Sequence, residues 1–479
     1  MDDQSAVIGL LSTHAEAVRE THISYVFLHK DRAYKLKKAV VLPFVDQSSL
    51  ARRKALCEAE LRINRRTAPA LYVGMRGVDG DRFDPPTPLD YVVEMRRFDE
   101  AGLVSNLVRD GALPPLLLRE LADEIAAFHE RAELVPRDGA AALRGVMAGN
   151  EERLRTFAPP LAGDDVEALI EATRRAFDKC ADQLTARGGT KIRRCHGDLH
   201  LGNIVRLSGH PVLFDAIEFS DAFSCIDVAY DLAFLLMDLC AQHAQAGANT
   251  VFNRYVDRTG DDAALGVLPL FLSVRAAIRA HVSVAQRRDG AGYLRLARDM
   301  LVRRPPGLMA VGGLSGSGKS TLAAALAPGF GQSPGARVLR SDVVRKQLFG
   351  VAPEVRLPVA AYSAQWSAQT YRTLLAQAET ALRAGYSVIL DAAFLGKPER
   401  VAAAEVAAKH GVPFSGFWLD APEAFLAARI AARTHDASDA TAEVMRAQAS
   451  RITGRLDWRR LDATASLAEL VREASIPYR

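Results

Sequence analysis

The sequence predicts two folds in one chain: an α+β region, followed by an α/β domain with a doubly wound parallel sheet. Three observations support this prediction. Residues 1–96 show short strand patterns with one helix, and residues 97–302 have mostly helical patterns. The segment 303–307, Arg-Arg-Pro-Pro-Gly, then marks a linker, because two prolines stop a helix. From residue 308 to residue 479, strand and helix patterns alternate.

Length and composition are those of a globular protein with several domains. A chain of 479 residues is too long for one hydrophobic core, and 49% apolar and 25% charged residues are ordinary proportions. The net charge of +4 is too small to indicate nucleic-acid binding. Five cysteines without a C-x-x-C pair indicate reduced thiols rather than a disulfide framework or a zinc site. The acidic N-terminus lacks a signal core and no apolar run approaches about 18 residues, so we expect a cytoplasmic protein without a membrane span.

The first 96 residues are expected to form a small sheet with one charged helix. The expected elements are an opening helix at 7–20, hairpin strands at 25–28 and 33–37, a helix at 50–66, and strands at 71–78 and 91–96. Pro69 ends the second helix. Helices are expected next at 117–131, 140–157 and 166–184.

A polar, motif-rich stretch at 195–215 follows these helices. Its spacing predicts a loop, a short strand, a tight turn and a second short strand that ends in Asp215, so that Asp198, Asn203 and Asp215 converge. Two carboxylates and an amide suit a divalent cation with oxygen ligands, and a carboxylate beside a metal-bound phosphate can accept the proton of an attacking hydroxyl. Each residue alone is more often a structural turn residue, but the set predicts a catalytic site.

The most specific pattern in the chain is G-x-x-x-x-G-K-[ST], which lies between a strand pattern and a helix pattern. The loop reads Gly313-Leu314-Ser315-Gly316-Ser317-Gly318-Lys319-Ser320-Thr321. Its glycines let backbone N–H groups surround phosphate oxygens, and the helix N-terminus adds partial positive charge. Lys319 can reach the β- and γ-phosphates and the Ser320 hydroxyl can ligate Mg²⁺, so the loop predicts nucleotide binding.

The rest of this domain supplies further charged candidates. Strands are expected at 308–312, 337–340, 387–390 and 414–419, and a helix at 422–433. Asp391 ends the third strand, where it can hold Mg²⁺ through water. Asp342 and Arg345 follow the second strand and can place a base beside a phosphate-binding cation, although Asp342 can also be a helix N-cap. Arg429 and Arg433 share a helix face and can neutralise phosphate charge; a solvated helix face is the alternative.

The pattern H-G-D-x-H-x-x-N with a following strand aspartate resembles the aminoglycoside phosphotransferase and choline kinase group, which has the two-lobed protein-kinase-like fold. The resemblance covers roughly residues 20–300 and implies a small lobe at 1–96 and a helical lobe at 97–302. It implies that Asp198 is the catalytic base and that Asn203 and Asp215 hold Mg²⁺.

The same resemblance implies that a lysine on the third strand pairs with a helix glutamate. Lys35 and Lys37 share one face of that strand, so spacing does not separate them, and Glu58 and Glu60 are equally open. Glu94-Met95 falls where the connector between the lobes should contact adenine. No G-x-G-x-x-G loop precedes the lysine, which is typical of small-molecule kinases of this fold with a plainer hairpin.

Two aspartates and two histidines near the catalytic loop also match this family pattern. Asp227 and Asp231 are implied to be structural and to hold the catalytic loop. His196 is assigned the same role, and His200 that of a turn residue only.

Residues 307–455 resemble the zeta-toxin, gluconate-kinase and polynucleotide 5′-hydroxyl kinase branch of P-loop kinases, through the phosphate loop, the D-x-x-R pattern, the strand aspartate and the paired arginines. This resemblance implies that Asp342 activates the acceptor hydroxyl and that Arg345 orients it.

We therefore expect a bifunctional kinase with two ATP and Mg²⁺ sites, acting on a hydroxyl of a sugar, aminoglycoside or polyol. Two alternatives stay open. The C-terminal domain can be a polynucleotide or nucleotide-sugar kinase, which predicts a basic groove with stacking aromatics such as Tyr362, Trp366 or Tyr371; nucleic acid is not the favoured partner. It can also bind nucleotide only to regulate the first domain. Substrate identity, ATP against GTP, and oligomeric state do not follow from the sequence.

Overall fold

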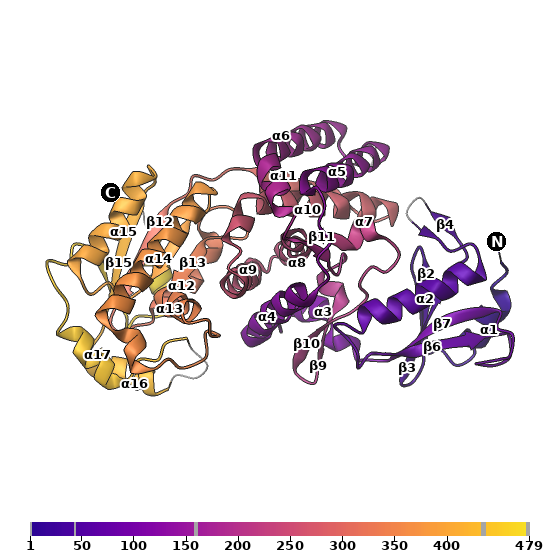
Figure 1. Ribbon diagram of the computed structural model, residues 1–479, viewed down its shortest axis with the longest axis horizontal. Helices are drawn as coiled ribbons and strands as arrows, with labels where there is room; N and C mark the ends of the chain where they lie inside the picture. Colours follow the sequence, from indigo (N-terminus) through magenta and orange to yellow (C-terminus); the bar gives the residue numbers. More distant parts are fainter. Residues whose placement is uncertain (1, 43–44, 158–160, 433–436, 476–479) are drawn as a thin grey trace. The chain divides into compact units, whose positions relative to one another are not determined.

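The computed structural model describes residues 2–42, 45–157, 161–432 and 437–475 (Figure 1). The chain forms two compact units. The first unit comprises Met1–Val166, Phe177–Gln242 and Val274–Gly290. The second unit comprises Glu167–Ala176, His243–Ser273 and Ala291–Arg479.

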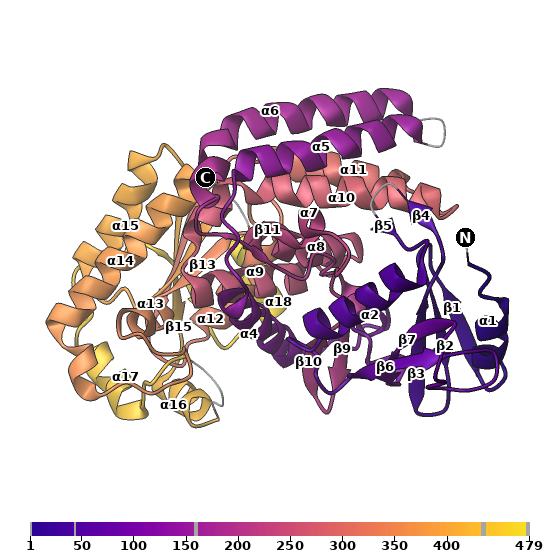
Figure 2. The same ribbon diagram turned by 45° about the vertical axis from the view of Figure 1, so that its right-hand side comes forward.

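The first unit begins with a five-stranded antiparallel sheet in the order β1-β2-β3-β7-β6. The strands are β1 (Ala17–Glu20), β2 (Ser24–Leu28), β3 (Arg32–Lys37), β6 (Tyr72–Val78) and β7 (Asp90–Arg96). Helix α2 (Leu50–Asn64) packs against β6 and β7, as both ribbon views show (Figures 1 and 2). The predicted small sheet with one helix is therefore present.

One expected element of this sheet is wrong. The opening helix α1 (Ser5–Ser12) ends well before residue 20, and the residues after it form β1. Val18 pairs there with Phe27 of β2, a residue that is fully buried. Pairing along an edge of the sheet thus overrides the helical pattern of this segment.

Helices dominate the remainder of the first unit. They are α3 (Val104–Arg109), α4 (Pro115–Arg131), α5 (Gly139–Thr156), α6 (Gly163–Arg187), α7 (Asp221–Ser224), α8 (Val228–Ala241) and α10 (Leu268–Ala285), with α6 and α10 extending into the second unit. Three strand pairs complete the unit: β4 (Val41–Leu42) with β5 (Val45–Asp46), β8 (Ile192–Arg194) with β11 (Cys225–Asp227), and β9 (Ile204–Leu207) with β10 (His210–Leu213). All five cysteines are buried, and none of them forms a disulfide bond in the described part of the chain.

Helix α10 is long and apolar, although the sequence contains no long uninterrupted apolar run. Averaged over 18 residues its hydropathy is 1.3, enough by length and composition to cross a membrane. Of that window, 67% is buried inside the fold, as in a core helix of a globular protein. A few polar side chains interrupt the run without lowering the average far.

The second unit contains a five-stranded, fully parallel sheet in the order β13-β14-β12-β15-β16, which confirms the predicted α/β fold. Its strands are β12 (Leu308–Gly313), β13 (Arg337–Arg340), β14 (Val388–Asp391), β15 (Phe414–Asp420) and β16 (Arg459–Asp462). Its helices are α9 (Gln245–Thr259), α11 (Ala291–Leu301), α12 (Lys319–Leu326), α13 (Ser341–Leu348), α14 (Ala364–Arg383), α15 (Lys397–Lys409), α16 (Glu423–Ala431), α17 (Ala442–Ala449) and α18 (Leu467–Ala474). Strand β16 was not expected, because Leu461 is its one apolar residue.

Helices α12 and α18 pack on this sheet through a buried cluster that includes Val311, Leu322 and Phe417. Helix α14 contacts both α13 and α15, and it also packs against β13 and β14. The packing fixes the ends of β12 and β14, where the phosphate loop and Asp391 lie.

Helix α9 belongs to the second unit and lies along the edge strand β13. The Asn253 side chain accepts the N–H of Val338 at 2.8 Å, and the Asn249 side chain donates to the carbonyl of Ala336 at 3.0 Å. Arg337 forms an ion pair with Asp257 of α9 at 2.7 Å. A helix that ends at Thr259, well before the first strand of the sheet at Leu308, therefore covers an edge that would otherwise expose unpaired backbone groups.

Candidate functional site

The loop of the first unit that carries the predicted catalytic residues is the segment 195–203, between β8 and β9. Asp231, in the first turn of α8, accepts hydrogen bonds from the N–H groups of His196 at 3.0 Å and Gly197 at 2.9 Å. His129 contacts the same carboxylate at 3.1 Å. Ligand-type atoms of His129, Cys195 and Asp231 lie within 4.8 Å of one another, but the Asp231 oxygens already accept the two loop N–H groups. The cluster therefore holds the loop through hydrogen bonds.

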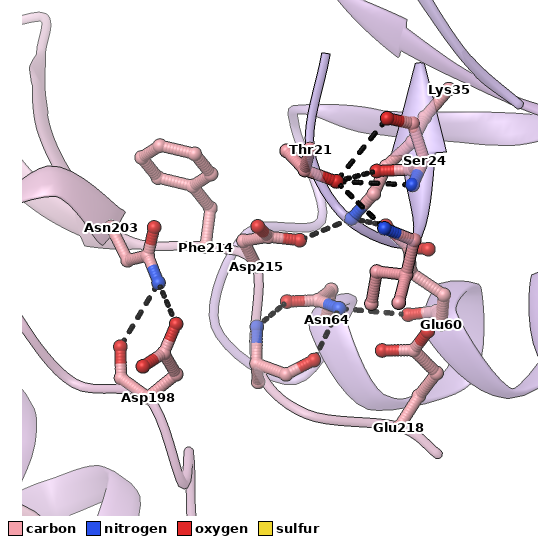
Figure 3. A network of polar contacts seen from close by, with 12 residues as sticks. Thr21, Ser24, Lys35, Glu60, Asn64, Asp198, Asn203, Phe214, Asp215 and Glu218 are labelled. Atoms are coloured by element: carbon pink, nitrogen blue, oxygen red, sulfur yellow. Dashed lines mark hydrogen bonds and ion pairs between the residues drawn. The ribbon is translucent and has the colours of Figure 1, made fainter. Parts of the chain in front are cut away.

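Asp198 and Asn203 lie face to face within this loop (Figure 3). The Asn203 Nδ2 atom donates to the Asp198 carboxylate at 2.9 Å and to the Asp198 carbonyl at 3.0 Å. This orientation turns the Asn203 Oδ1 atom away from Asp198, as a ligand for a cation requires (Figure 3). The Asp198 side chain is 38% exposed, so an acceptor hydroxyl can reach it.

His200 sets the charge of Asp198. Its Nδ1 atom accepts the N–H of Gly202 at 3.0 Å, so Nε2 is the protonated nitrogen, and Nε2 lies 3.5 Å from the Asp198 carboxylate. Burial raises the pKa of Asp198, but the charge and hydrogen bond of His200 outweigh that effect and lower the pKa. Asp198 is therefore ionised at neutral pH, and His200 does more than form a turn.

Asp215 follows β10 in a backbone conformation with φ +61°, unusual for a residue other than glycine. Its N–H donates to the Tyr72 hydroxyl at 3.1 Å. The next residue, Ala216, donates its N–H to the Asn64 side chain at 2.7 Å and accepts from it at 3.4 Å. Contacts from β6 and α2 therefore stabilise a strained backbone that aims the Asp215 carboxylate at Lys35, which it contacts (Figure 3).

The lysine–glutamate pair left open by the sequence is Lys35 with Glu60, at 2.9 Å (Figure 3). Glu58 is exposed, because residues two apart on a helix lie on different faces. Burial raises the pKa of Glu60, but Lys35 and Lys37 outweigh it, so the net shift is downward and Glu60 stays charged. Lys37 contacts Glu60 and also Glu218, a residue the sequence did not single out.

A cavity of about 180 Å³ lies beside Lys35 and Asp215. Met95, Phe98 and Phe214 are among its lining residues. The lining also includes two polar residues of the β1–β2 hairpin, Thr21 and Ser24, which hydrogen-bond to each other (Figure 3). This hairpin takes the place of the missing glycine-rich loop, and its residues carried no motif that could have identified them.

Of the expected pair Glu94-Met95, only Met95 lines the cavity. Neighbouring strand residues point to opposite faces, so the Glu94 side chain lies on the other side of β7. It forms ion pairs there with Arg32 at 3.1 Å and Arg76 at 3.4 Å. The Glu94 side chain is therefore not placed to contact a nucleotide.

The second candidate site is the loop between β12 and α12. Gly316 and Gly318 have φ of +88° and +92°, and a Cβ atom on Gly316 would lie 2.6 Å from a carbonyl oxygen. Arg429 covers the loop, since its guanidinium lies 3.1 Å from the position of a Cβ atom on Gly318. Arg433 lies outside the described residues. The structure thus places one of the two expected arginines at the phosphate loop.

The ligand-type atoms of the phosphate loop already have internal partners. The Ser320 hydroxyl donates to Asp391 at 2.6 Å, which brings together the two residues expected at Mg²⁺. Lys319 donates to the carbonyl of Leu314 at 3.0 Å. The N–H of Ser315 donates to the side chain of Gln448, on α17, at 2.9 Å. Gln448 was not expected, because an isolated glutamine on a helix carries no sequence signal.

A cavity of about 720 Å³ joins this loop to Asp342 and Arg345. Helix α13 begins at Ser341 after the N-cap Arg340, so Asp342 lies in its first turn and is not the cap. Burial raises the pKa of Asp342 above its ordinary value. Arg345 is held by the carbonyl of Ala361 at 2.7 Å and lies 4.9 Å from the centre of the Tyr362 ring.

Of the aromatics considered for stacking, Tyr362 and Tyr371 line this cavity. The Tyr371 hydroxyl accepts the N–H of Phe394 at 2.9 Å, while Trp366 packs against Phe349 at a centroid distance of 4.6 Å. Tyr362 therefore both lines the cavity and lies against Arg345, the residue expected to orient the acceptor.

Both sites present hard oxygen donors that fit Mg²⁺. The first offers the carboxylate of Asp215 and the amide oxygen of Asn203. The second offers the Ser320 hydroxyl and the Asp391 carboxylate. Neither set contains a thiolate or imidazole, so softer transition metals are not favoured.

Comparisons with known proteins agree with this geometry. The family model "Phosphotransferase enzyme family" matches residues 26–265, and the model "AAA domain" matches residues 308–454. An uncharacterised protein of Mycobacterium tuberculosis (strain ATCC 25618 / H37Rv) is 31% identical over 462 residues, 92% of this chain and 90% of that protein. An uncharacterised protein of Mycobacterium bovis matches with the same values.

Two solved structures are similar to parts of the chain. A gluconokinase from Sinorhizobium meliloti 1021 is 25% identical and covers 36% of this chain and 91% of its own, with a TM-score of 0.25. A choline kinase from Cryptosporidium parvum Iowa II is 10% identical and covers 62% of this chain and 94% of its own, with a TM-score of 0.39. On the strength of the family model and the mycobacterial relatives, the chain belongs to the phosphotransferase enzyme family and carries a P-loop kinase domain after it.

Proposed function

We propose that the chain is a bifunctional, ATP- and Mg²⁺-dependent phosphotransferase that acts on hydroxyl groups of small molecules at two separate sites. The observation that supports this most directly is the arrangement in the first unit. Lys35 pairs with Glu60 and Asp215, and Asn203 holds the ionised Asp198 at the open side of the same site. Protein-kinase-like enzymes need this set for phosphoryl transfer.

At the first site, Asp198 accepts the proton of the acceptor hydroxyl. The acceptor oxygen then forms a bond to the γ-phosphorus, and the bond from that phosphorus to the β–γ bridging oxygen breaks, which releases ADP. Lys35 orients the phosphates while Glu60 holds its ammonium group in place. Mg²⁺, held by Asn203 and Asp215, would neutralise charge on the phosphates. The 180 Å³ cavity beside Met95 and Phe98 receives the adenine ring.

At the second site, Asp342 takes the role of base and the 720 Å³ cavity holds both nucleotide and acceptor. Lys319 and Arg429 neutralise the phosphates, and Arg345 orients the acceptor. A nucleic-acid or nucleotide-sugar acceptor is the second candidate for this site, since Tyr362 is 37% exposed and lines the cavity beside Asp342.

The test is ATP consumption over a panel of sugars, polyols, aminoglycosides, nucleotide sugars and short oligonucleotides. Asp198→Asn and Lys319→Ala are each compared with wild type, and Asp164→Asn and Lys409→Ala serve as controls because both residues are exposed. We expect each active-site change to lower turnover on its own class of acceptor by about 10²–10⁴-fold. Full turnover by both variants on every accepted substrate would refute the proposal. If Lys319→Ala alone has no effect on any substrate, the second site regulates and does not transfer phosphate.

A further inference from the structure

Lys37 is a buried cation that the proposed reaction does not use. It lies two residues after Lys35 on β3, and its side chain is 0% exposed. It contacts two carboxylates, Glu60 and Glu218, which are themselves buried. Removing an ammonium group from water costs several kcal/mol, so such a pair persists only where its geometry serves a purpose or its partners compensate fully.

The charges around Lys37 do compensate. Burial opposes its charge, but Glu218 and Glu60 outweigh that effect and raise the pKa of Lys37. Two lysines, Lys35 and Lys37, thus share two buried glutamates. Without Glu218, Glu60 would be the one carboxylate left in contact with Lys37 among the described residues, while it also pairs with Lys35.

Glu218 lies three residues after Asp215, in the segment 215–218 that follows β10. This segment is attached to the small sheet at both ends, by Lys35 at Asp215 and by Lys37 at Glu218. Its middle is attached to α2 through the two hydrogen bonds between Asn64 and Ala216. The backbone at Asp215 has positive φ, so it needs such attachments to keep its direction.

The two ends of this segment differ in one respect. Lys35 and Asp215 line the 180 Å³ cavity, whereas Lys37 and Glu218 are absent from its described lining. A nucleotide that enters the cavity competes for Lys35 and for Asp215. It leaves the contact between Lys37 and Glu218 untouched.

We propose that Lys37 and Glu218 form a positioning pair that fixes the metal-binding carboxylate of Asp215 against β3 while nucleotide occupies the site. This inference rests on the proposed function of the first site. The pair touches neither substrate nor metal, and it acts through the segment 215–218. Mutating groups that orient a metal ligand typically lowers metal affinity about 10- to 100-fold.

The experiment measures nucleotide binding as a function of Mg²⁺ concentration in a Lys319→Ala background, where the second site is disabled. The probe is ATP, and its affinity is also measured without Mg²⁺. Glu218→Gln keeps the shape of the side chain and removes its charge. Lys37→Met removes the cation, and the double variant removes both. Lys38→Met is the matched control, since Lys38 pairs with the exposed Glu20.

For Glu218→Gln we expect the half-maximal Mg²⁺ concentration to rise about ten- to a hundredfold, with little change in Mg²⁺-free ATP affinity. The double variant should keep the raised Mg²⁺ requirement, because it also lacks the contact between β3 and the segment 215–218. Its melting temperature should recover part of any loss, because it leaves no uncompensated charge buried. Lys38→Met should behave as wild type.

A Mg²⁺ requirement that is unchanged in Glu218→Gln would overturn the inference, and a lower melting temperature without that change would show a purely structural pair. If Lys37→Met fails to fold, Glu218→Gln and Glu218→Asp still decide the question. A Lys319→Ala protein with no other change that binds no ATP at any Mg²⁺ concentration would instead refute the proposed function of the first site, and the inference with it.

Discussion

Replacing Asp257 by asparagine should destabilise the second unit, although Asp257 lies on a helix far from the phosphate loop in sequence. Its partner Arg337 is 1% exposed and forms ion pairs with Asp257 at 2.7 Å and with Asp262 at 3.4 Å. Asn253 accepts a further hydrogen bond from this guanidinium at 3.2 Å. Asp257→Asn keeps an oxygen acceptor but removes the nearer of the two compensating charges.

The size of the effect follows from burial. Breaking a buried ion pair by removing one partner costs about 3–5 kcal/mol, and the remaining Asp262 places this case near the lower end. For a unit of this size, each kcal/mol lowers the melting temperature by about 2–4 °C, so we expect a drop of roughly 6–12 °C. The double variant Asp257→Asn with Arg337→Met should recover part of the loss, because no charge is then left buried alone.

The assay is thermal unfolding followed in a calorimetric scan. The transition of the second unit is identified as the one whose shift on adding ATP is lost in the Lys319→Ala variant. Asp420→Asn is the control, since Asp420 and its partner Arg460 are both more than half exposed. We expect that control to change stability by less than about 1 kcal/mol. Equal, small shifts for Asp257→Asn and Asp420→Asn would refute the assignment of α9 to the second unit.

Three further predictions concern the sites. The acid limb of the pH–rate profile should lie at higher pH for the second site, measured in Asp198→Asn, than for the first site, measured in Lys319→Ala. Burial raises the pKa of Asp342, whereas His200 lowers the pKa of Asp198 by more than burial raises it. Each base works only when it is ionised. Gln448→Ala should strengthen ATP binding at the second site about two- to tenfold in calorimetry, because one N–H of the loop loses an internal acceptor; weaker binding would contradict this. Tyr72→Phe should lower turnover at the first site about threefold or more with little effect on folding, because the Asp215 N–H loses its acceptor; unchanged kinetics would contradict it.

The sequence predicted both folds because their signals are local. Apolar strand patterns alternate with helices around the phosphate loop, and the spacing of Asp198, Asn203 and Asp215 reflects a loop, a hairpin and a strand end. Each of these elements depends on residues within about twenty positions along the sequence, and hydrophobic periodicity and turn residues indicate structure over that range.

Elements set by distant contacts could not be predicted in the same way. Residues 17–20 have a helical pattern but pair with β2, and β16 has one apolar residue to mark it. The choice between Glu58 and Glu60 depends on how α2 is rotated against the sheet, which a weakly amphipathic helix does not specify. Glu218 contacts Lys37, and Gln448 contacts Ser315, in each case more than a hundred positions away. No local sequence pattern could therefore predict these two residues.

The two proposed sites share one physical feature that would decide how they bind nucleotide. In each, groups expected to meet phosphate or Mg²⁺ already have partners within the chain: Lys35 holds Asp215, and Ser320 holds Asp391. Ligand binding is then an exchange of partners, and its free energy is the difference between two sets of contacts. Where the internal partner has no role after the exchange, as with Gln448, removing it should strengthen binding. Where the partner itself becomes a ligand of Mg²⁺, as with Asp215 and Asp391, removing it should abolish phosphoryl transfer. The direction of the change on mutation therefore distinguishes a temporary partner from a catalytic one.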